Sequence, residues 1–325
     1  MSTAIGKWLL MITVWGSIVP LSSAAGFEWK DTPGKYIDLH RDGKKVLRYM
    51  CAFDASTPQK QVETFKVFYH VFDETGEKFL TNGPDGDHPY PAVTYPHHRG
   101  IFVGWNKTGF QGKTVDTWHM KGAVQKHIRV LDRKTASDRA SLKTLIHWLT
   151  DSGNVIVEEQ REVIVYASAQ DIFKADFVCE LKAVEGDINL DGDPEHAGFQ
   201  YRPHNDVAIA PVESRAKYLF PTETADPTKD QNIPWVGLEY PLNGKTYHVL
   251  HCTSPANPQP YVYSAYRDYG RFGSFFKTSI SKGRTLKLDY RIRVCPGNLP
   301  SRDQLNRDYL AFVTERNLDK SEKNP

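Results

Sequence analysis

The sequence lacks several features that identify common protein classes. It has only four cysteines in 325 residues, none in a C-x-x-C pair, which excludes zinc-knuckle and thioredoxin-type motifs. It has no block of lysine and arginine, and its 41 basic residues nearly balance its 39 acidic ones, so nucleic acid is not an expected partner. It also has no P-loop, no dinucleotide-binding glycine motif and no G-x-S-x-G elbow, which argues against kinases, dehydrogenases and elbow-type hydrolases.

Long hydrophobic runs are absent after the N-terminal segment. Residues 8–21 form an uncharged apolar run that follows Lys7 and precedes the small residues Ser22 to Ala25. This layout predicts a secretory signal peptide over residues 1–25, and the run is shorter than the roughly 20 residues of a membrane span. We therefore expect an exported protein, periplasmic or extracellular, without a membrane span; an uncleaved N-terminal anchor is the alternative.

The four cysteines, Cys51, Cys179, Cys252 and Cys295, all lie in strand-like apolar runs. Buried free thiols are the simpler expectation. Export to an oxidising compartment also leaves two disulfides open, and the sequence does not choose among the three possible pairings.

Apolar residues alternate with polar ones in many short segments, which is typical of antiparallel strands. Strands are expected at residues 62–72, 78–80, 142–149, 155–166, 172–184, 199–202, 236–240, 246–252, 275–280 and 285–294. One helix is expected at about 302–317, capped by Ser301, before a polar tail at 320–325. The prediction is an all-β protein, a large antiparallel β-sandwich in a single domain over residues 26–325 with a short C-terminal helix.

The first polar block is residues 95–105, which contains Pro-His-His-Arg-Gly before a strand-like run. On a strand, His98, Gly100, Phe102 and Gly104 share one face. Glycines in strands often mark a close approach to the backbone, so Gly100 and Gly104 are expected to leave room beside His98. A tolerated bulge with surface histidines is the alternative.

The second polar block is residues 193–204. Its alternate positions place His196, Gly198, Gln200, Arg202 and His204 on one face of a strand. Imidazole, amide and guanidinium groups around a glycine suit a polyhydroxylated or carboxylated ligand. An ordinary hydrated sheet face is the alternative.

Three further segments carry polar groups: residues 116–119, with His119; residues 261–273, with Arg267 and Tyr269 among several tyrosines; and the Asp85-Gly86-Asp87-His88 turn. No H-E-x-x-H or H-x-H motif is present. Ligands on a sandwich can nevertheless converge from separate strands, so a divalent-metal site remains possible. Its candidate ligands are His98, His119, His196 and His204, with Glu195 or Asp193.

These blocks resemble the PmoA-like family of exported proteins. Residues 96–105 followed by Asp116-Thr117-Trp118 are similar to its P-H-H-R-G and D-F-W elements, residues 195–202 to its glycine-rich block, and residues 267–270 to its R-D-Y-G block. The sequence departs from the family pattern at Thr117 and His196. The resemblance implies a sandwich akin to the galactose-mutarotase supersandwich, but the methane oxygenase in the family's name is not expected of a chain without membrane spans.

Two function classes remain. The first is a carbohydrate-active enzyme of lyase, hydrolase or epimerase type, with His98 or His196 as general acid/base. Glu195 or Asp193 would orient that histidine or act as the second acid/base group. The second is a non-catalytic protein that binds a small carbohydrate or glycoside on the same face. Substrate-binding residues are predicted as follows: His97, Arg99, His119, Gln200, Arg202, His204, Arg267 and Tyr269.

Overall fold

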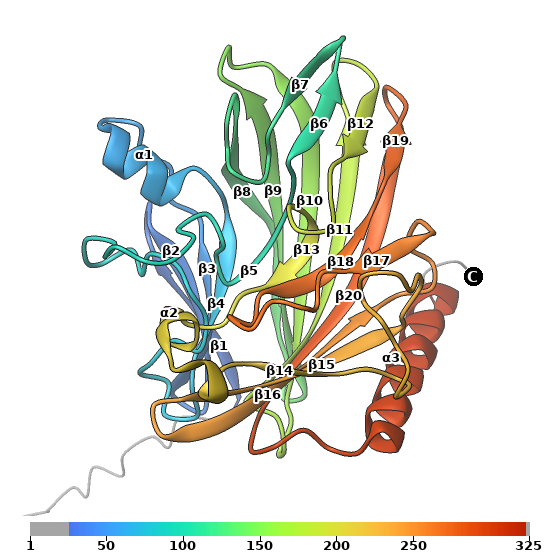
Figure 1. Ribbon diagram of the computed structural model, residues 1–325. Coiled ribbons are helices and arrows are strands. Elements are labelled where there is room, and N and C mark those ends of the chain that lie inside the picture. The colour runs from blue at the N-terminus through green and yellow to red at the C-terminus, as the bar shows by residue number, and fades with distance from the viewer. Residues whose placement is uncertain (1–25, 323–325) are drawn as a thin grey trace, which may run out of the picture.

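The computed structural model describes residues 26–322. The predicted signal peptide, residues 1–25, and the last three residues of the predicted tail lie outside the described residues. Within the described part, twenty strands form three sheets, each antiparallel throughout (Figure 1).

The first large sheet runs from the N-terminal hairpins to strands of the second polar block. Its order is β1 (Phe27–Thr32), β2 (Tyr36–Arg41), β3 (Lys44–Met50), β4 (Phe68–Val71), β5 (Ile101–Trp105), β13 (Ala197–Tyr201), β18 (Phe272–Phe276) and β17 (Tyr261–Tyr263).

The second large sheet contains the longest strands. Its order is β14 (Lys217–Leu219), β15 (Trp235–Leu242), β16 (Lys245–Thr253), β20 (Thr285–Pro296), β11 (Phe173–Ala183), β10 (Val155–Tyr166), β9 (Arg139–Thr150) and β8 (Ala123–Thr135). A smaller sheet has the order β19 (Thr278–Ile280), β12 (Ile188–Asp191), β6 (Lys107–Phe110) and β7 (Lys113–Val115).

One continuous apolar core joins the two large sheets. In β9 every second side chain from Ala140 to Trp148 is buried, as the alternating sequence predicts. The core cluster includes Tyr49 and Val103 from the first sheet and Leu142 and Phe177 from the second. The predicted fold class, an antiparallel β-sandwich with a C-terminal helix, is therefore confirmed.

The helices lie outside the sheets. They are α1 (Pro58–Thr64), α2 (Asn205–Ile209), a 3₁₀ turn (Val212–Ser214) and α3 (Arg302–Glu322). Helix α3 begins at the predicted residue but runs beyond residue 317 (Figure 1). Its residues Leu305 and Phe312 pack against Trp235 of β15. No helix among residues 26–322 is both long enough and apolar enough to cross a bilayer.

Three strand predictions were wrong in whole or in part. Residues 78–80 form no strand and make only an isolated bridge, between Phe79 and Phe72. Residues 62–64 end α1, because Thr57 caps this helix by accepting the Lys60 amide at 3.2 Å and Pro58 stands in its first turn. Residues 275–280 are divided between β18 and β19, which belong to different sheets. Apolar periodicity detects a strand but not the point at which the chain passes from one sheet to the next.

All four cysteines are free thiols within the described chain. Cys179, Cys252 and Cys295 are buried and Cys51 is half-buried. Burial raises the pKa of the Cys51 and Cys252 thiols to about 12. The expectation of core thiols is confirmed.

Candidate functional site

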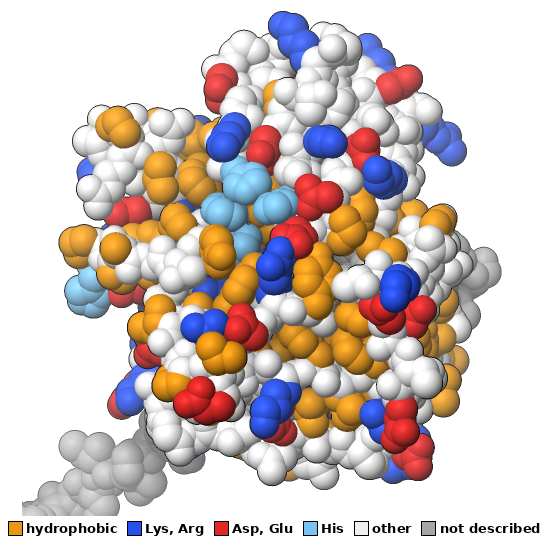
Figure 2. All heavy atoms as spheres, in the orientation of Figure 1, with side chains coloured by type: hydrophobic (Ala, Val, Ile, Leu, Met, Phe, Trp, Pro, Cys, Tyr) orange, Lys and Arg blue, Asp and Glu red, His pale blue; other side chains and the backbone are white. Residues whose placement is uncertain are grey.

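Four histidines from three loops meet at one place on the surface shown in Figure 2. The ring of His97 lies 4.3 Å from that of His98 and 4.4 Å from that of His119, measured between centroids. The rings of His119 and His196 are 5.1 Å apart. We call His97, His98, His119 and His196 the histidine cluster. Its members are separated by up to 99 positions in the sequence, so tertiary structure alone brings them together.

His119 is held by a short turn between β7 and β8. The Asp116 carboxylate accepts hydrogen bonds from the backbone amides of Trp118 and His119, at 2.9 and 2.7 Å. Its second oxygen lies 2.8 Å from His119 Nδ1. Burial raises the pKa of the Asp116 carboxyl, but these hydrogen bonds outweigh burial and hold the pKa below its usual value. The turn therefore fixes an ionised carboxylate on one nitrogen of the ring.

His196 repeats this arrangement before β13. The Asp193 carboxylate accepts the Glu195 amide at 3.0 Å and lies 2.8 Å from His196 Nδ1, while its other oxygen accepts the Asn106 side chain at 2.8 Å. Burial raises the pKa of Asp193, and the hydrogen bonds from His196 and Asn106 lower it by more. The Asp116–His119 turn and the Asp193–His196 turn therefore share one sequence spacing, Asp-x-x-His.

The sequence contains a third Asp-x-x-His turn, which stays apart from the histidine cluster. Asp85 accepts the amides of Asp87 and His88 and lies 2.7 Å from His88 Nδ1. The His88 side chain is 80% exposed, however, and it approaches none of the other histidine rings within the described chain. The turn is thus a local structure, and only two of its three copies converge.

His97 and His98 differ from the other two histidines because neither ring has a carboxylate partner. Burial lowers the pKa of His97 to about 2, and nearby positive charge from Lys66 adds to this effect. Burial, followed by the charge of Arg271, lowers the pKa of His98 well below its usual value. Both rings are therefore neutral at physiological pH.

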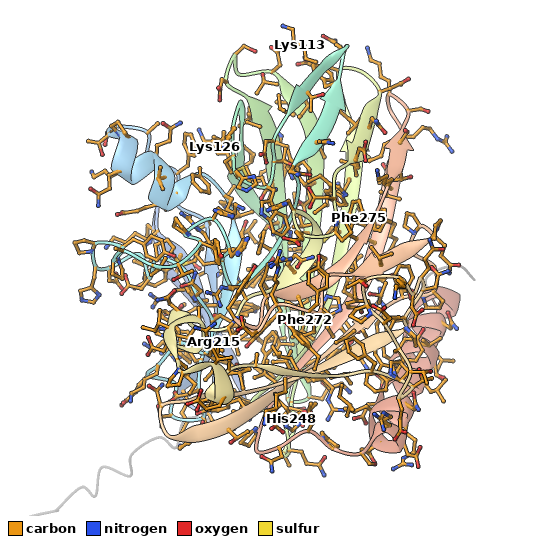
Figure 3. The ribbon with its side chains drawn as sticks, viewed as in Figure 1. Lys113, Lys126, Arg215, His248, Phe272 and Phe275 are labelled. Carbon is orange, nitrogen blue, oxygen red and sulfur yellow. The ribbon has the colours of Figure 1, made fainter. Side chains whose placement is uncertain are left out.

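Buried cations lie behind the histidine cluster. The Arg271 guanidinium is 5.6 Å from the Trp118 ring centroid, and it donates to Gln200 Oε1 at 3.0 Å and Ser264 Oγ at 2.8 Å. Arg271 directly precedes β18, whose first residue, Phe272, lies at the centre of the view in Figure 3. Arg202 donates to the Tyr269 carbonyl at 2.7 Å, and its guanidinium is 5.1 Å from the Tyr269 ring centroid.

Lys66 connects two of the loops that form the histidine cluster. It is 1% exposed and donates to the backbone carbonyls of His97, at 3.1 Å, and of Trp118. Burial lowers the pKa of the Lys66 ammonium well below its usual value. Sequence reasoning missed Lys66 as a site residue, and it included Arg271 only as part of the tyrosine-rich segment at residues 261–273. One sequence feature could have identified both residues: each is a single basic residue inside an otherwise apolar or aromatic run.

Some of the residues predicted for the site lie at or beside the histidine cluster, and others do not. Glu195 forms an ion pair with Arg267 at the rim. Burial raises the pKa of the Glu195 carboxyl, but the hydrogen bond and charge of Arg267 outweigh burial, so the pKa lies below its usual value. Tyr269 stacks on His98 at 6.0 Å. Gln200 is fully buried and acts as an acceptor for Arg271.

The side chains of Arg99 and His204 make contacts outside the histidine cluster. The Arg99 guanidinium donates to the backbone carbonyls of Pro96, Glu63 and Val62, so it connects the His97 turn to α1. His204 precedes α2 and accepts the Asp206 amide at 3.3 Å as its cap. The expected row of His196, Gln200, Arg202 and His204 on one open face is therefore not present, because β13 is buried at every position.

The strand glycines allow close approach, as predicted, but what approaches is neighbouring backbone. A Cβ atom on Gly104 would lie 2.3 Å from the Thr117 carbonyl oxygen, and one on Gly100 would lie 2.0 Å from that of Tyr69. Gly104 thus lets the Asp116–His119 turn pack directly on β5, which carries His119 toward His97.

A cavity of about 510 Å³ lies between α1 and the Pro84–Pro89 loop rather than over the histidine cluster. Its charged lining residues are largely paired with one another, Lys35 with Asp87 and Lys60 with Asp54. The histidine cluster is the better candidate site, because both ring nitrogens of its buried member His98 have no protein partner.

Among residues 26–322, no group of three or more His, Cys, Asp or Glu side chains is arranged to hold a metal ion. Of the residues proposed as metal ligands, His204 is engaged at α2, whereas His98, His119 and His196 belong to the histidine cluster. A bound divalent metal stays a prediction.

The solved structures that resemble this chain do so at low identity. Heparan sulfate lyase HepC from Pedobacter heparinus aligns with 86% of this chain at 9% identity and a TM-score of 0.44, and this chain spans only 38% of that protein. A GalM/aldose epimerase homologue from C. elegans aligns with 85% of this chain and 100% of its own at 8% identity and a TM-score of 0.36. The Slr1438 protein from Synechocystis sp. PCC 6803 aligns with 88% of this chain and 100% of its own, at 10% identity and a TM-score of 0.37. These likenesses concern the fold alone.

Comparison with curated proteins gives no match. One family model matches residues 36–309, a segment that contains the whole histidine cluster and most of both large sheets. The PmoA-like resemblance itself stays a prediction. Since the match extends over more than half of the sequence, the chain belongs to the family of unknown function DUF6807.

Proposed function

We propose that this protein is an exported carbohydrate-active enzyme of lyase or epimerase type, in which His119 and His196 transfer protons. One observation carries the proposal: two Asp–His pairs, each with 2.8 Å between carboxylate oxygen and Nδ1, hold their rings 5.1 Å apart. The proposal does not include the oxygenase activity named in the PmoA-like label.

The carboxylates set the tautomer of both rings. Because Asp116 and Asp193 are ionised acceptors, Nδ1 of each neutral ring carries the proton, and Nε2 keeps a lone pair that can accept one. The same carboxylates stabilise the imidazolium that forms. One ring can thus take a proton from the substrate while its protonated neighbour returns one, which is the balance that lyases and epimerases require.

A hydrolase with two catalytic carboxyl groups fits the site less well. Such enzymes keep one carboxylic acid protonated while the other is ionised. At this site the pKa values of Asp116, Asp193 and Glu195 are all lowered, because hydrogen bonds and ion pairs outweigh burial. None of the three serves as a proton donor near neutral pH.

The remaining residues take supporting roles in this proposal. His196 keeps the acid/base role predicted from the sequence, and His119 takes the one predicted for His98. Glu195 and Arg267 form the rim. Tyr95 is 44% exposed and lies 5.0 Å from Tyr269, so these aromatic rings can stack on the apolar face of a sugar.

Deuterium exchange tests the proposed reaction. Neutral and oxidised sugars and glycosides are incubated with the purified protein in D₂O, and loss of carbon-bound protons and appearance of unsaturated or epimeric products are followed by NMR. Wild type is expected to exchange or convert a member of the panel, and His119→Gln and His196→Gln to abolish it. His88→Gln, in the third Asp-x-x-His turn, is the matched control and keeps full activity.

Two outcomes contradict the proposal. Release of a reducing sugar without exchange or a new double bond indicates hydrolysis. Binding of a glycan without turnover, at an affinity that His196→Gln leaves unchanged, supports the non-catalytic alternative. Elemental analysis of protein purified without chelators tests the metal prediction separately.

A further inference from the structure

Three buried cations near the histidine cluster have no carboxylate partner. Lys66, Arg202 and Arg271 are each at most 1% exposed. Among the ion pairs of the described chain, none includes any of the three. Glu195, a carboxylate at the rim, is paired with Arg267 instead.

Several other buried arginines are paired with a carboxylate, whereas buried Arg99 donates from all three of its nitrogens to backbone carbonyls. Arg48 lies 2.7 Å from Asp38, Arg161 lies 2.6 Å from Glu159, and Arg291 lies 2.5 Å from Asp176. A buried charge without a partner is costly, so folded proteins neutralise most of them in this way. Arg202 and Arg271 differ from both kinds, because they have neither a carboxylate partner nor a complete set of hydrogen-bond acceptors.

Hydrogen-bond donors are also left unused at this place. Nε and Nη2 of Arg202, Nε of Arg271 and Nε1 of Trp118 are buried and have no partner, and neither ring nitrogen of His98 has one. Aromatic contacts link these groups, since the Trp118 ring lies 5.6 Å from both His98 and the Arg271 guanidinium. Unsatisfied buried donors of this kind cost stability and call for an explanation.

We propose that Arg202 and Arg271, with Trp118 and His98, form a subsite for the carboxylate of an acidic sugar, so that the substrate is a uronic acid or a uronate-containing glycan. The inference rests on the proposed function and names its substrate class. A carboxylate supplies the missing negative charge, and its two oxygens accept the unused donors.

The subsite is covered in the structure described here. The Tyr95 ring lies 5.3 Å from His98, and the Tyr269 ring lies against both His98 and Arg202. Tyr95 has a φ of 57°, in the left-handed region that few tyrosines adopt, within the turn closed by its carbonyl and the His98 amide. A carboxylate reaches the donors when these two tyrosine side chains swing aside.

A carboxylate at this place also favours the proposed proton transfer. When Nε2 of one histidine takes the proton from the carbon next to the carboxylate, the C–H electron pair moves into the carboxylate to form an enediolate. Its added negative charge faces Arg202 and Arg271, which stabilise it. The carbon then regains a proton from the other histidine, giving the epimer. Alternatively, the neighbouring C–O bond breaks and its oxygen leaves with the electron pair and takes up a proton, giving the unsaturated sugar.

Calorimetric titration with matched sugars tests the subsite. The probes are glucuronic and galacturonic acid, their neutral parents glucose and galactose, and glucose 6-sulfate. At least one uronic acid is expected to bind about 10- to 100-fold more tightly than its neutral parent, as expected for charge-assisted hydrogen bonds. Arg271→Gln is expected to remove this preference without changing the affinity for the neutral parent. Arg133→Gln, a distant surface substitution, keeps it.

A measurement on wild type alone covers the case in which Arg271→Gln does not fold. The preferred uronic acid then raises the melting temperature of wild type more than its neutral parent does at equal concentration. The subsite is overturned if neutral sugars bind as tightly, if no uronic acid binds, or if glucose 6-sulfate binds and the uronic acids do not. Uronate preference without deuterium exchange would overturn only the proposed reaction, and exchange on neutral sugars without uronate preference would overturn only the subsite.

Discussion

The imidazole of His119 lies 5.1 Å from that of His196, although the two residues are 77 positions apart in the sequence. Each ring is held from behind by an aspartate three residues earlier. The turn that produces this contact is local, whereas the meeting of the two turns depends on β5 pairing with β13.

The aspartates should matter for rate more than for binding. Replacing Asp193 by Asn removes the charge that fixes the His196 tautomer and stabilises its imidazolium. We expect kcat on the substrate found by deuterium exchange to fall by about 10²- to 10⁴-fold with little change in KM. Asp85→Asn, at the exposed copy of the same turn, should leave kcat unchanged. An equal loss in both variants would show that the turn has only a structural role.

Acid should destabilise the protein through its buried histidines. Burial lowers the pKa of His70 and His251 to about 3. In the unfolded chain an imidazole has a pKa of about 6.5, so below that pH the unfolded state binds protons that the folded state does not. The free energy of unfolding should therefore fall as the pH drops from 6.5 toward 4, by about 1.4 kcal/mol per pH unit for each such histidine.

Denaturant unfolding at pH 7, 6, 5 and 4 checks this dependence. His70→Gln should make the decline shallower by about 1.4 kcal/mol per pH unit. The exposed His88 is the control: Asp85 raises its pKa, so His88→Gln should not make the decline shallower. An unchanged slope in His70→Gln would contradict a neutral buried imidazole.

Gly104 should be intolerant of a side chain. Its added Cβ would lie 2.3 Å from the Thr117 carbonyl oxygen, so alanine must push the Asp116–His119 turn away from β5. We expect Gly104→Ala to lower the free energy of unfolding by about 1–3 kcal/mol and to reduce turnover as His119 moves. Gly26→Ala meets no atom within 4 Å and is the control, measured in the same thermal and activity assays.

The four cysteines should titrate as free thiols. Without reductant, a thiol reagent should modify four groups in denatured protein. In native protein, where three cysteines are buried and Cys51 is half-buried, it should modify at most one. Two or no reactive groups after denaturation would instead indicate disulfides.

The strands could be predicted from the sequence because each large sheet has one face on a common core. The residues 155–166 and 285–294 show the alternation that such burial imposes, and the structure has strands at both. The Asn243-Gly244 turn between β15 and β16 likewise follows from residue type, since both residues adopt positive φ, 53° and 74°, which asparagine and glycine tolerate. The chain's passage from β18 to β19 left no such signal, because only Lys277 separates the two strands and no turn residue marks the change of sheet.

The candidate site could be predicted from the sequence only in part. Local chemistry determines the Asp-x-x-His turns, because an aspartate accepts the amides two and three residues later wherever the spacing occurs. The sequence does not distinguish the exposed copy at Asp85 from the two that converge. It also suggested that Gln200 and Arg202 face solvent, since β13 was taken to have one open face and is instead covered on both.

By itself, the sequence determined the all-β class and the chemical groups available for a site, because these depend on residue type and spacing. Only the tertiary structure decided which groups act together. Strand pairing across long sequence separations set His97, His98, His119 and His196 side by side. It also left Arg202 and Arg271 buried without the carboxylates that neutralise Arg48, Arg161 and Arg291. Charge compensation is a property of neighbours in space, and neighbours in space are what the fold creates.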